Sequence, residues 1–242
     1  MSHFITLVIL PKGTTMEQVE SKAALLLEPY NEDIRVAPYQ TGCCCVGIQA
    51  RKEVEAKVAE SFNINEIREG FHSLPEEERT DEKWAELVAP YKEMRTRLLE
   101  AHPLKDKPNP ECKSCQGTGK RMTQYNPASK WDSWVIGGRW DGWIFGPERE
   151  KASSDGKGGF NFGGEHHSPE NNCRPVSKIP IEDPYYVPFA IVTPESDWIE
   201  QGKMGFWAIV ANPVSDEEWH QTVKAVLSKY PDHLAVVVDC HI

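Results

Sequence analysis

The sequence predicts an α+β protein with a ferredoxin-like sandwich whose sheet contains both ends of the chain. Residues 3–10 form an apolar run typical of a buried strand, and residues 19–30 continue with helical spacing. Near the other end, residues 215–227 repeat the helical spacing, and residues 233–242 are rich in the β-branched residues typical of a strand. Units of strand and helix at opposite ends of the chain favour one sheet that holds both termini, with the middle of the chain inserted into it.

The elements of the predicted core have individual signals. Apolar residues of the first helix recur on one face, at Val19, Ala23, Leu26 and Leu27. In the second helix, Ser215 followed three residues later by Glu218 is a capping-box signature. Short apolar runs at residues 189–192 and 205–210 predict two further strands.

The middle of the chain has a different composition, which sets the predicted domain boundaries. Apolar residues on one face indicate amphipathic helices over residues 51–62 and 81–101. We therefore expect an α+β core formed by residues 1–50 and 181–242 around an insertion at residues 51–180. The insertion comprises helices within residues 51–101, a segment with paired cysteines, tryptophans and glycines at 108–146, and a Gly-, Ser- and Asn-rich loop at 151–175, mobile or a lid.

The composition is that of a globular protein with one large domain or one domain carrying an inserted module. The 242 residues are 39% hydrophobic and 26% charged, and the mean hydropathy is -0.54. A formal charge of -10 argues against coating nucleic acid through bulk electrostatics, although it leaves room for a local basic pocket. No apolar stretch approaches the about 20 residues of a transmembrane helix. The odd number of cysteines, 7, favours a reducing compartment, so we expect a cytoplasmic protein.

Cys112 and Cys115 predict a zinc site. This C-x-x-C pair places two thiolates on one tight turn, and the following Gly-x-Gly lets the backbone fold back, as in zinc knuckles. Structural zinc takes four ligands, and we expect Cys173 and His167 to supply the other two, because both lie in the Gly-rich segment that a metal would tether. The remaining candidates are His166, Cys43, Cys44 and Cys45. A pair of reduced thiols and a redox pair are the alternatives to a metal site.

The consecutive cysteines at 43–45 have a simpler interpretation. They most simply form a strand, with Cys44 on one face and Cys43 and Cys45 on the other. Because a buried free cysteine behaves as a small hydrophobe, we expect these thiols to pack in a core.

Residues 125–143 carry the strongest signal for a ligand pocket. They hold four of the 8 tryptophans, which exceeds the needs of a core strand because each indole N–H requires a partner. A Gly-Gly pair lets main-chain N–H groups hold an anion, Lys and Arg add charge, and indoles stack on a base or sugar. The predicted ligand-binding residues are Lys130, Trp131, Gly137, Gly138, Arg139 and Trp140. In the alternative, the tryptophans pack over the inserted helices, and Lys130 and Arg139 pair with Asp132 and Asp141.

Asp239 and His241 are the predicted catalytic residues. They alternate on the last strand and therefore share a face, where an Asp can orient a His as a general base or form a metal pair with it. The alternative is that both face solvent near the end of the chain, with Cys240 and Ile242 pointing inward.

Several of these strings together resemble a family of bacterial and phage-encoded proteins. The resemblance rests on the NPASKWD string at residues 126–132, IGGRW at 136–140, KMGFW at 203–207, DCHI at 239–242 and the C-x-x-C pair. It spans most of the chain and implies a prokaryotic or phage source. It transfers no catalytic assignment.

These observations favour binding, and in the enzymatic case hydrolysis, of a phosphate-containing small molecule or a short single-stranded nucleic acid at the tryptophan-rich segment. The alternative is a non-enzymatic module in which a zinc-stabilised insertion engages a protein partner, since Trp and Arg dominate interface energetics. Duplex DNA is disfavoured because the chain lacks a basic helix or helix-turn-helix pattern.

Overall fold

The computed structural model describes residues 2–146, 168–205 and 209–242, and the chain divides into two compact units. Unit 1 comprises Met1–Val36 and Tyr125–Ile242, and unit 2 comprises Ala37–Gln124. The boundaries differ from the predicted ones, because the insertion starts near residue 37 instead of 51 and ends near 124 instead of 180. The tryptophan-rich segment therefore belongs to unit 1 and not to the insertion.

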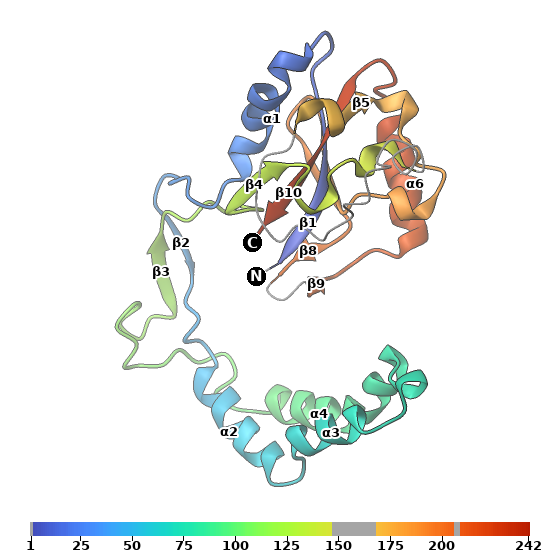
Figure 1. Cartoon of the computed structure of the whole chain (residues 1–242). Coiled ribbons are helices and arrows are strands. Elements are labelled where there is room, and N and C mark those ends of the chain that lie inside the picture. The colour runs from blue at the N-terminus through green and yellow to red at the C-terminus, as the bar shows by residue number, and fades with distance from the viewer. Residues whose placement is uncertain (1, 147–167, 206–208) are drawn as a thin grey trace. The chain divides into compact units, whose positions relative to one another are not determined.

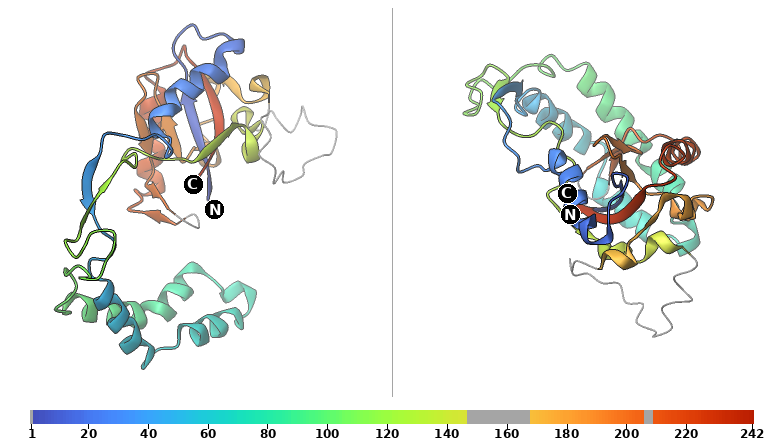
Figure 2. Two further views of the ribbon diagram at one scale, coloured as in Figure 1. Left: turned by 90° about the vertical axis from the view of Figure 1, so that its left-hand side faces the viewer. Right: turned by 90° about the horizontal axis from the view of Figure 1, so that it is seen from above.

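Unit 1 is built on a six-stranded mixed sheet in the order β4-β10-β1-β6-β7, with β5 also paired to β10 (Figure 1). The strands are β1 (His3–Ile9), β4 (Ser133–Ile136), β5 (Cys173–Pro175), β6 (Ala190–Val192), β7 (Trp198–Glu200) and β10 (Leu234–His241). Strand β1 pairs antiparallel with β10 from His3 opposite His241 to Ile9 opposite Ala235, and parallel with β6. The N- and C-termini therefore lie next to each other at one end of the central strands (Figure 2).

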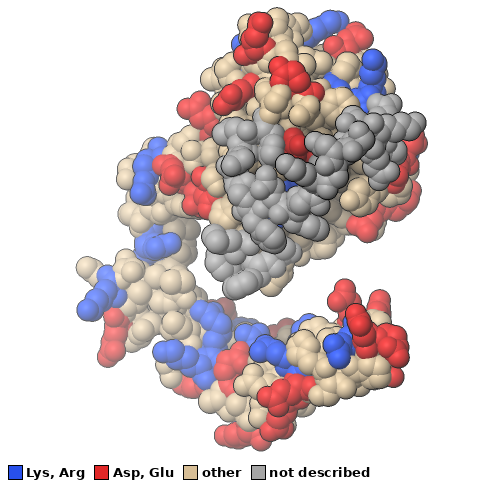
Figure 3. All heavy atoms as spheres, viewed as in Figure 1, with Lys and Arg blue, Asp and Glu red and all other residues tan. Residues whose placement is uncertain are grey.

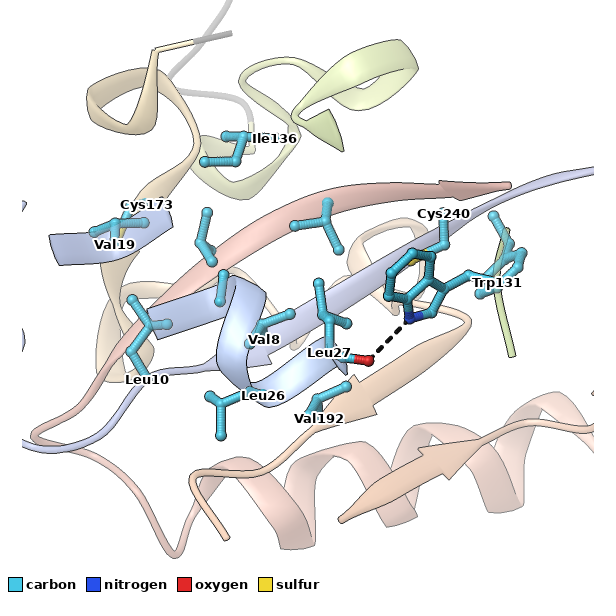
Figure 4. Close-up of a cluster of buried hydrophobic side chains, with 14 of the residues drawn as sticks. Val8, Leu10, Val19, Leu26, Leu27, Trp131, Ile136, Cys173, Val192 and Cys240 are labelled. Atoms are coloured by element: carbon cyan, nitrogen blue, oxygen red, sulfur yellow. Dashed lines mark hydrogen bonds between the residues drawn. The ribbon is translucent and has the colours of Figure 1, made fainter. Parts of the chain in front are cut away.

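Helices cover both faces of this sheet. Because side chains alternate along a strand, Val8 packs with α1 (Val19–Leu27) and Leu7 packs with α6 (Asp216–Leu227) in two separate hydrophobic clusters. Figure 4 shows the α1 cluster, which includes the Trp131 indole. The predicted α+β class is confirmed. The ferredoxin-like sandwich is not, because that arrangement keeps both helices on one face of the sheet, whereas α1 and α6 lie on opposite faces.

The remaining predictions for unit 1 have mixed outcomes. The capping box of α6 is confirmed, with the Ser215 hydroxyl accepting from the Glu218 N–H. In place of one strand over residues 205–210, two short strands, β8 (Lys203–Met204) and β9 (Val210–Ala211), form an antiparallel pair, and residues 206–208 lie outside the described residues. Of the predicted loop, residues 151–167 also lie outside them. Its last three residues form β5, because they pair with β10.

The two points where the chain leaves and re-enters unit 1 are joined by hydrogen bonds. The buried Asn126 donates from Nδ2 to the carbonyl oxygens of Pro29 and Asn31, at 2.7 and 2.9 Å. The Lys130 N–H donates to the Tyr30 carbonyl at 2.8 Å. Residues that precede and follow the insertion are thus held side by side within unit 1.

Unit 2 contains a two-stranded antiparallel sheet and three helices. The elements are β2 (Tyr39–Gly42), α2 (Ile48–Ala59), α3 (Ile64–His72), α4 (Asp81–Glu100) and β3 (Lys120–Thr123). Helices over residues 51–62 and 81–101 were predicted and are present as α2 and α4, whereas α3 was not predicted. Its signal is the cap at Asn63, whose side chain accepts from the N–H groups of Asn65 and Glu66.

Short 3-10 helices complete the described elements: Met16–Gln18, Glu28–Tyr30, Glu76–Glu78, Gly138–Trp140, Trp143–Phe145, Pro169–Asn171, Val176–Lys178 and Pro184–Tyr186. Among the described residues, none of the helices has both the length and the apolar character needed to cross a membrane.

Candidate metal centre and histidine–aspartate cluster

Four cysteines of unit 2 come together at the end of the antiparallel pair of strands β2 and β3. The Sγ atoms of Cys43, Cys45, Cys112 and Cys115 all lie within 4.8 Å of one another. The closest pairs are Cys45 with Cys115 at 3.4 Å and Cys43 with Cys112 at 3.7 Å. Zinc bonded tetrahedrally to sulfur at about 2.3 Å separates its ligands by about 3.8 Å. The four thiols therefore have the number, type and spacing of ligands that a metal ion requires.

Two turns place these thiols. Strand pairing brings Gly42 opposite Lys120, and the Cys43 N–H donates to the Gly119 carbonyl at 2.8 Å, so both turns lie at the same end of the β2–β3 pair. Gly117 and Gly119 have φ angles of +79° and +74°, a region that favours glycine, as the C-x-x-C-x-G-x-G pattern predicts. Gly47, at φ +68°, closes the first turn.

The pKa values of the thiols differ between the two turns. Burial raises the pKa of the Cys45 thiol to about 12. For Cys115, burial acts in the same direction, but hydrogen bonds from Cys45 and the Gly119 backbone outweigh it and lower the pKa to about 7. Backbone N–H groups of Cys115 and Ser114 lower the pKa of Cys112. The C-x-x-C turn thus favours thiolates, the form in which cysteine binds metals.

The predicted ligand set needs correction in its second half. Cys112 and Cys115 belong to the group, but Cys43 and Cys45 complete it in place of Cys173. Cys173 lies in β5 within the α1 cluster of unit 1, where burial raises the pKa of its thiol to about 12. His167 lies outside the described residues. The cysteines at 43–45 do not form a strand, since they leave β2 as a turn with Cys44 exposed.

The chain segments next to the cysteine group are rich in exposed basic residues. The Gly47 N–H donates to the Lys107 carbonyl at 2.8 Å, which brings residues 105–107 beside the two turns. The exposed cations of residues 42–51, 105–107 and 111–121 are Arg51, Lys105, Lys107, Lys113, Lys120 and Arg121. None of the six forms an ion pair with a carboxylate that the structure describes, and the same segments contain two carboxylates, Asp106 and Glu111. Figure 3 shows Lys and Arg gathered on this part of unit 2.

The tryptophan-rich segment of unit 1 serves the core. Trp131 is 7% exposed and donates from Nε1 to the Leu27 carbonyl at 3.1 Å, so its ring is not available to stack on a ligand (Figure 4). Trp140 packs against the α6 cluster. Lys130 pairs with Glu200 at 2.5 Å, and not with Asp132 or Asp141 as the alternative interpretation predicted.

The Gly-Gly pair accommodates protein side chains. A Cβ atom on Gly137 would lie 2.7 Å from the Asn172 amide, and one on Gly138 would lie 2.5 Å from the Asp239 Cβ. The N–H of Arg139, next to this pair, donates to Asp239 Oδ2 at 3.1 Å, so a carboxylate of the protein occupies the place where an external anion was predicted. Of the six predicted ligand-binding residues, Arg139 alone keeps an exposed side chain.

Asp239 and His241 lie together in a polar cluster at the end of the sheet. Asp239, which is 4% exposed, accepts from His3 Nδ1 at 2.8 Å, and His241 Nδ1 contacts Asp132 Oδ1 at 2.5 Å. The rings of His3 and His241 lie edge to face with centroids 4.8 Å apart. The shared face of Asp239 and His241 follows from strand alternation. Sequence reasoning missed His3, whose placement depends on the pairing of β1 with β10.

Asn172 is a second residue that sequence reasoning missed. It is fully buried, donates to Asp141 Oδ1 and accepts from the Gly142 N–H at 2.9 Å. It thus fixes the turn that follows the Gly-Gly pair. Nothing in its local sequence, a Glu-Asn-Asn string in a polar segment, distinguishes it from a loop residue.

Comparisons with known proteins return no match to this chain among family models, curated proteins or solved structures. They therefore do not bear on the resemblance to bacterial and phage-encoded proteins.

Proposed function

We propose that unit 2 is a module organised by a structural zinc ion and that its basic surface binds a single-stranded polynucleotide. The observation that carries this proposal is the convergence of four cysteine Sγ atoms within 4.8 Å, on chain segments that also carry exposed Lys and Arg residues. The ligands are Cys43, Cys45, Cys112 and Cys115.

The ligand chemistry favours zinc over calcium or magnesium. Four thiolates in a tetrahedral arrangement suit zinc or iron–sulfur chemistry, whereas calcium and magnesium require oxygen ligands. A set of four protein ligands leaves no open position for substrate, which is the property of a structural site. The ion would stabilise unit 2 and would not itself take part in a reaction.

The charge around the centre favours a polyanion as the partner. Zinc with four thiolates carries a net charge of about -2. The six exposed cations outnumber the two carboxylates by more positive charges than are needed to neutralise the metal centre. A positive surface therefore remains. This local surface is compatible with the overall formal charge of -10, because acidic residues are concentrated elsewhere, including Glu76, Glu77 and Glu78 at the 3-10 helix between α3 and α4.

A single strand fits this surface better than a duplex. Arg51 lies in the first turn of α2, whose cations are offset by Glu53 and Glu55, and the other five lie in the loops or on β3. Among the described residues, this surface therefore offers no strongly basic helix to enter a major groove. Met122 on β3 is 62% exposed beside Lys120 and Arg121, which gives an unstacked base an apolar contact. A flexible strand can follow such a compact surface with its phosphates.

Binding of a fluorescently labelled 12-nucleotide single strand to the full-length protein tests the proposal by anisotropy at several salt concentrations. We expect the affinity to fall as the salt concentration rises. Each phosphate contact adds about 0.7 to the slope of the logarithm of the binding constant against the logarithm of the salt concentration. Replacing Lys107, Lys113 and Lys120 with Ala should reduce that slope by about 2 and weaken binding at least tenfold at low salt.

The matched control replaces Lys57, Arg68 and Lys92 with Ala, which changes the net charge equally at exposed positions of α2, α3 and α4. Both triple variants must retain zinc. Equal loss of binding in the two variants, or no binding by the parent protein, would overturn the proposal. Polyglutamate of equal charge binding as tightly as the oligonucleotide would point to an acidic protein partner instead.

A further inference from the structure

The two imidazoles at the end of the sheet in unit 1 have the arrangement of an acid–base pair. His3 and His241 face each other across β1 and β10, and their side chains are 26% and 16% exposed. Both are therefore partly shielded but reachable from solvent. Each has a carboxylate on Nδ1, Asp239 for His3 and Asp132 for His241.

The carboxylates determine which nitrogen of each ring is free. A carboxylate accepts hydrogen bonds, so each Nδ1 carries the proton and each Nε2 is left to exchange a proton with another molecule. Among the described residues, neither Nε2 has a hydrogen-bond partner.

The backbone around the pair is built to hold it. Gly138 adopts φ +54° and approaches Asp239 so closely that any Cβ would overlap its side chain, which lets the Arg139 N–H bind Asp239 Oδ2. Asp239 thus has one oxygen on a backbone N–H and the other on His3. On the second ring, the Asp132 N–H donates to the His241 carbonyl at 3.0 Å.

We propose that His3 and His241 form a catalytic pair that cleaves phosphodiesters by general acid–base catalysis, with Asp239 and Asp132 as positioning residues. The neutral imidazole takes the proton of the attacking hydroxyl, from water or a ribose 2′-OH, as the new P–O bond forms. The protonated imidazole gives its proton to the leaving oxygen as the old P–O bond breaks. Atoms and charge balance without an oxidant or a further reactant.

The charges near the pair favour a diester over a monoester. Arg139 is exposed and its backbone N–H is bonded to Asp239 Oδ2, so a cationic side chain starts beside the pair, which itself supplies one imidazolium. A diester carries a single negative charge, whereas the transferring group of a monoester spreads more charge and usually requires metal ions.

Metal-ligating histidines also place a carboxylate on the second nitrogen, so a metal site is the competing interpretation. In the part of the chain that the structure describes, the cysteines form the one group of three or more candidate ligands that lie together. The carboxylates of Asp239 and Asp132 each contact one imidazole, but no group of three ligand atoms converges there among the described residues, so acid–base chemistry is the better supported role.

The test measures hydrolysis of bis(4-nitrophenyl) phosphate and of a single-stranded ribo-oligonucleotide by the full-length protein. We expect His241→Gln to lower the rate at least 100-fold, since general acid–base groups contribute about 10²–10⁴. Asp132→Asn should lower it less and displace the pH–rate profile. In the parent protein, the rate plotted against pH should pass through a maximum, because one imidazole must be neutral and the other protonated. The charged residues beside the pair are Asp132, Asp239 and Arg139.

The matched control is His102→Gln in unit 2. His102 also contacts a carboxylate, Glu53, at 3.1 Å and its side chain is 16% exposed like that of His241, so its loss should leave the rate unchanged. If His241→Gln loses activity and unit 1 is also unfolded, the Asp132→Asn variant decides instead. Its carboxylate is 32% exposed, so this substitution changes a less buried side chain. An unchanged rate and pH profile in that variant would overturn the proposal.

Two further outcomes would also overturn it. The first is absence of hydrolysis by the parent protein. The second is activity that a chelator abolishes and Mn²⁺ restores in a Cys45→Ser background, which would indicate metal catalysis. The inference does not rest on polynucleotide binding by unit 2, because the small diester needs no such surface.

Discussion

Unit 1 buries two hydrophobic clusters, one on each face of its sheet, whereas unit 2 buries four aliphatic side chains and three cysteines. The buried hydrophobic residues of unit 2 are Cys43, Cys45, Ala50, Val54, Val58, Val88 and Cys115. A chain segment with so small a core cannot easily offset its conformational entropy through burial of apolar surface alone. The comparison teaches that this chain joins a unit held by packing to a unit with a small core, for which the four cysteines offer a metal site as a further source of stability.

The largest expected effect is the loss of unit 2 when its metal is removed. Structural zinc contributes about 10–16 kcal/mol of apparent binding free energy. We expect Cys45→Ser, or a strong chelator, to abolish stoichiometric zinc and to unfold helices α2, α3 and α4, seen as lost far-ultraviolet ellipticity. Tryptophan fluorescence should change little, because Trp84 is the sole tryptophan of unit 2.

Cys44→Ser is the matched control, because the Cys44 side chain is exposed and outside the group of four. It should retain zinc and ellipticity. The protein could be held by disulfides and not by a metal only if it keeps its helices after chelation and a thiol titration finds four fewer free thiols than the sequence contains.

The next largest effect concerns the packed core of unit 1. Leu7 is fully buried in the α6 cluster, so Leu7→Ala should lower the free energy of unfolding of unit 1 by about 3–5 kcal/mol through lost burial and a cavity. Denaturant unfolding followed by tryptophan fluorescence measures this. Leu25→Ala, at a position 60% exposed, should change the free energy by less than about 0.5 kcal/mol. Equal effects in the two variants would contradict the assignment of the core.

The smallest effect tests a single hydrogen bond within that core. Trp131→Phe removes the Nε1 donor and leaves the Leu27 carbonyl without it, which should cost about 1–2 kcal/mol in the free energy of unfolding. Trp140→Phe makes the same change at an indole with no hydrogen bond to any described residue, so it should cost less. The difference between the two variants, measured by thermal unfolding, is the contribution of the bond. No difference would mean that water satisfies the Leu27 carbonyl in the variant.

The sequence was most informative where a signal is local. The capping box at Ser215 and the C-x-x-C turn at Cys112 and Cys115 each depend on residues a few positions apart, and both are present in the structure. The partners of these elements are distant in the chain. Cys43 and Cys45 reach the C-x-x-C turn through the pairing of β2 with β3, and His3 reaches Asp239 through the pairing of β1 with β10.

The tryptophan-rich segment shows why composition alone did not locate a ligand site. A run of indoles, glycines and cations is compatible with a pocket and with a packed turn, and the choice depends on what lies opposite. Asn172 and Asp239 fill the space beside Gly137 and Gly138, and Leu27 offers its carbonyl to Trp131. None of these three neighbours is close in sequence to the segment that it contacts.

The bonds from Asn126 to Pro29 and Asn31 have a consequence for the architecture of the chain. They hold the departing and returning segments together on the unit 1 side, while Tyr39 pairs with Thr123 on the unit 2 side. An 88-residue cassette whose ends already meet behaves topologically like a surface loop. Residues 37–124 are therefore suited to excision with a short bridging linker, or to transplantation into a hairpin of another host protein.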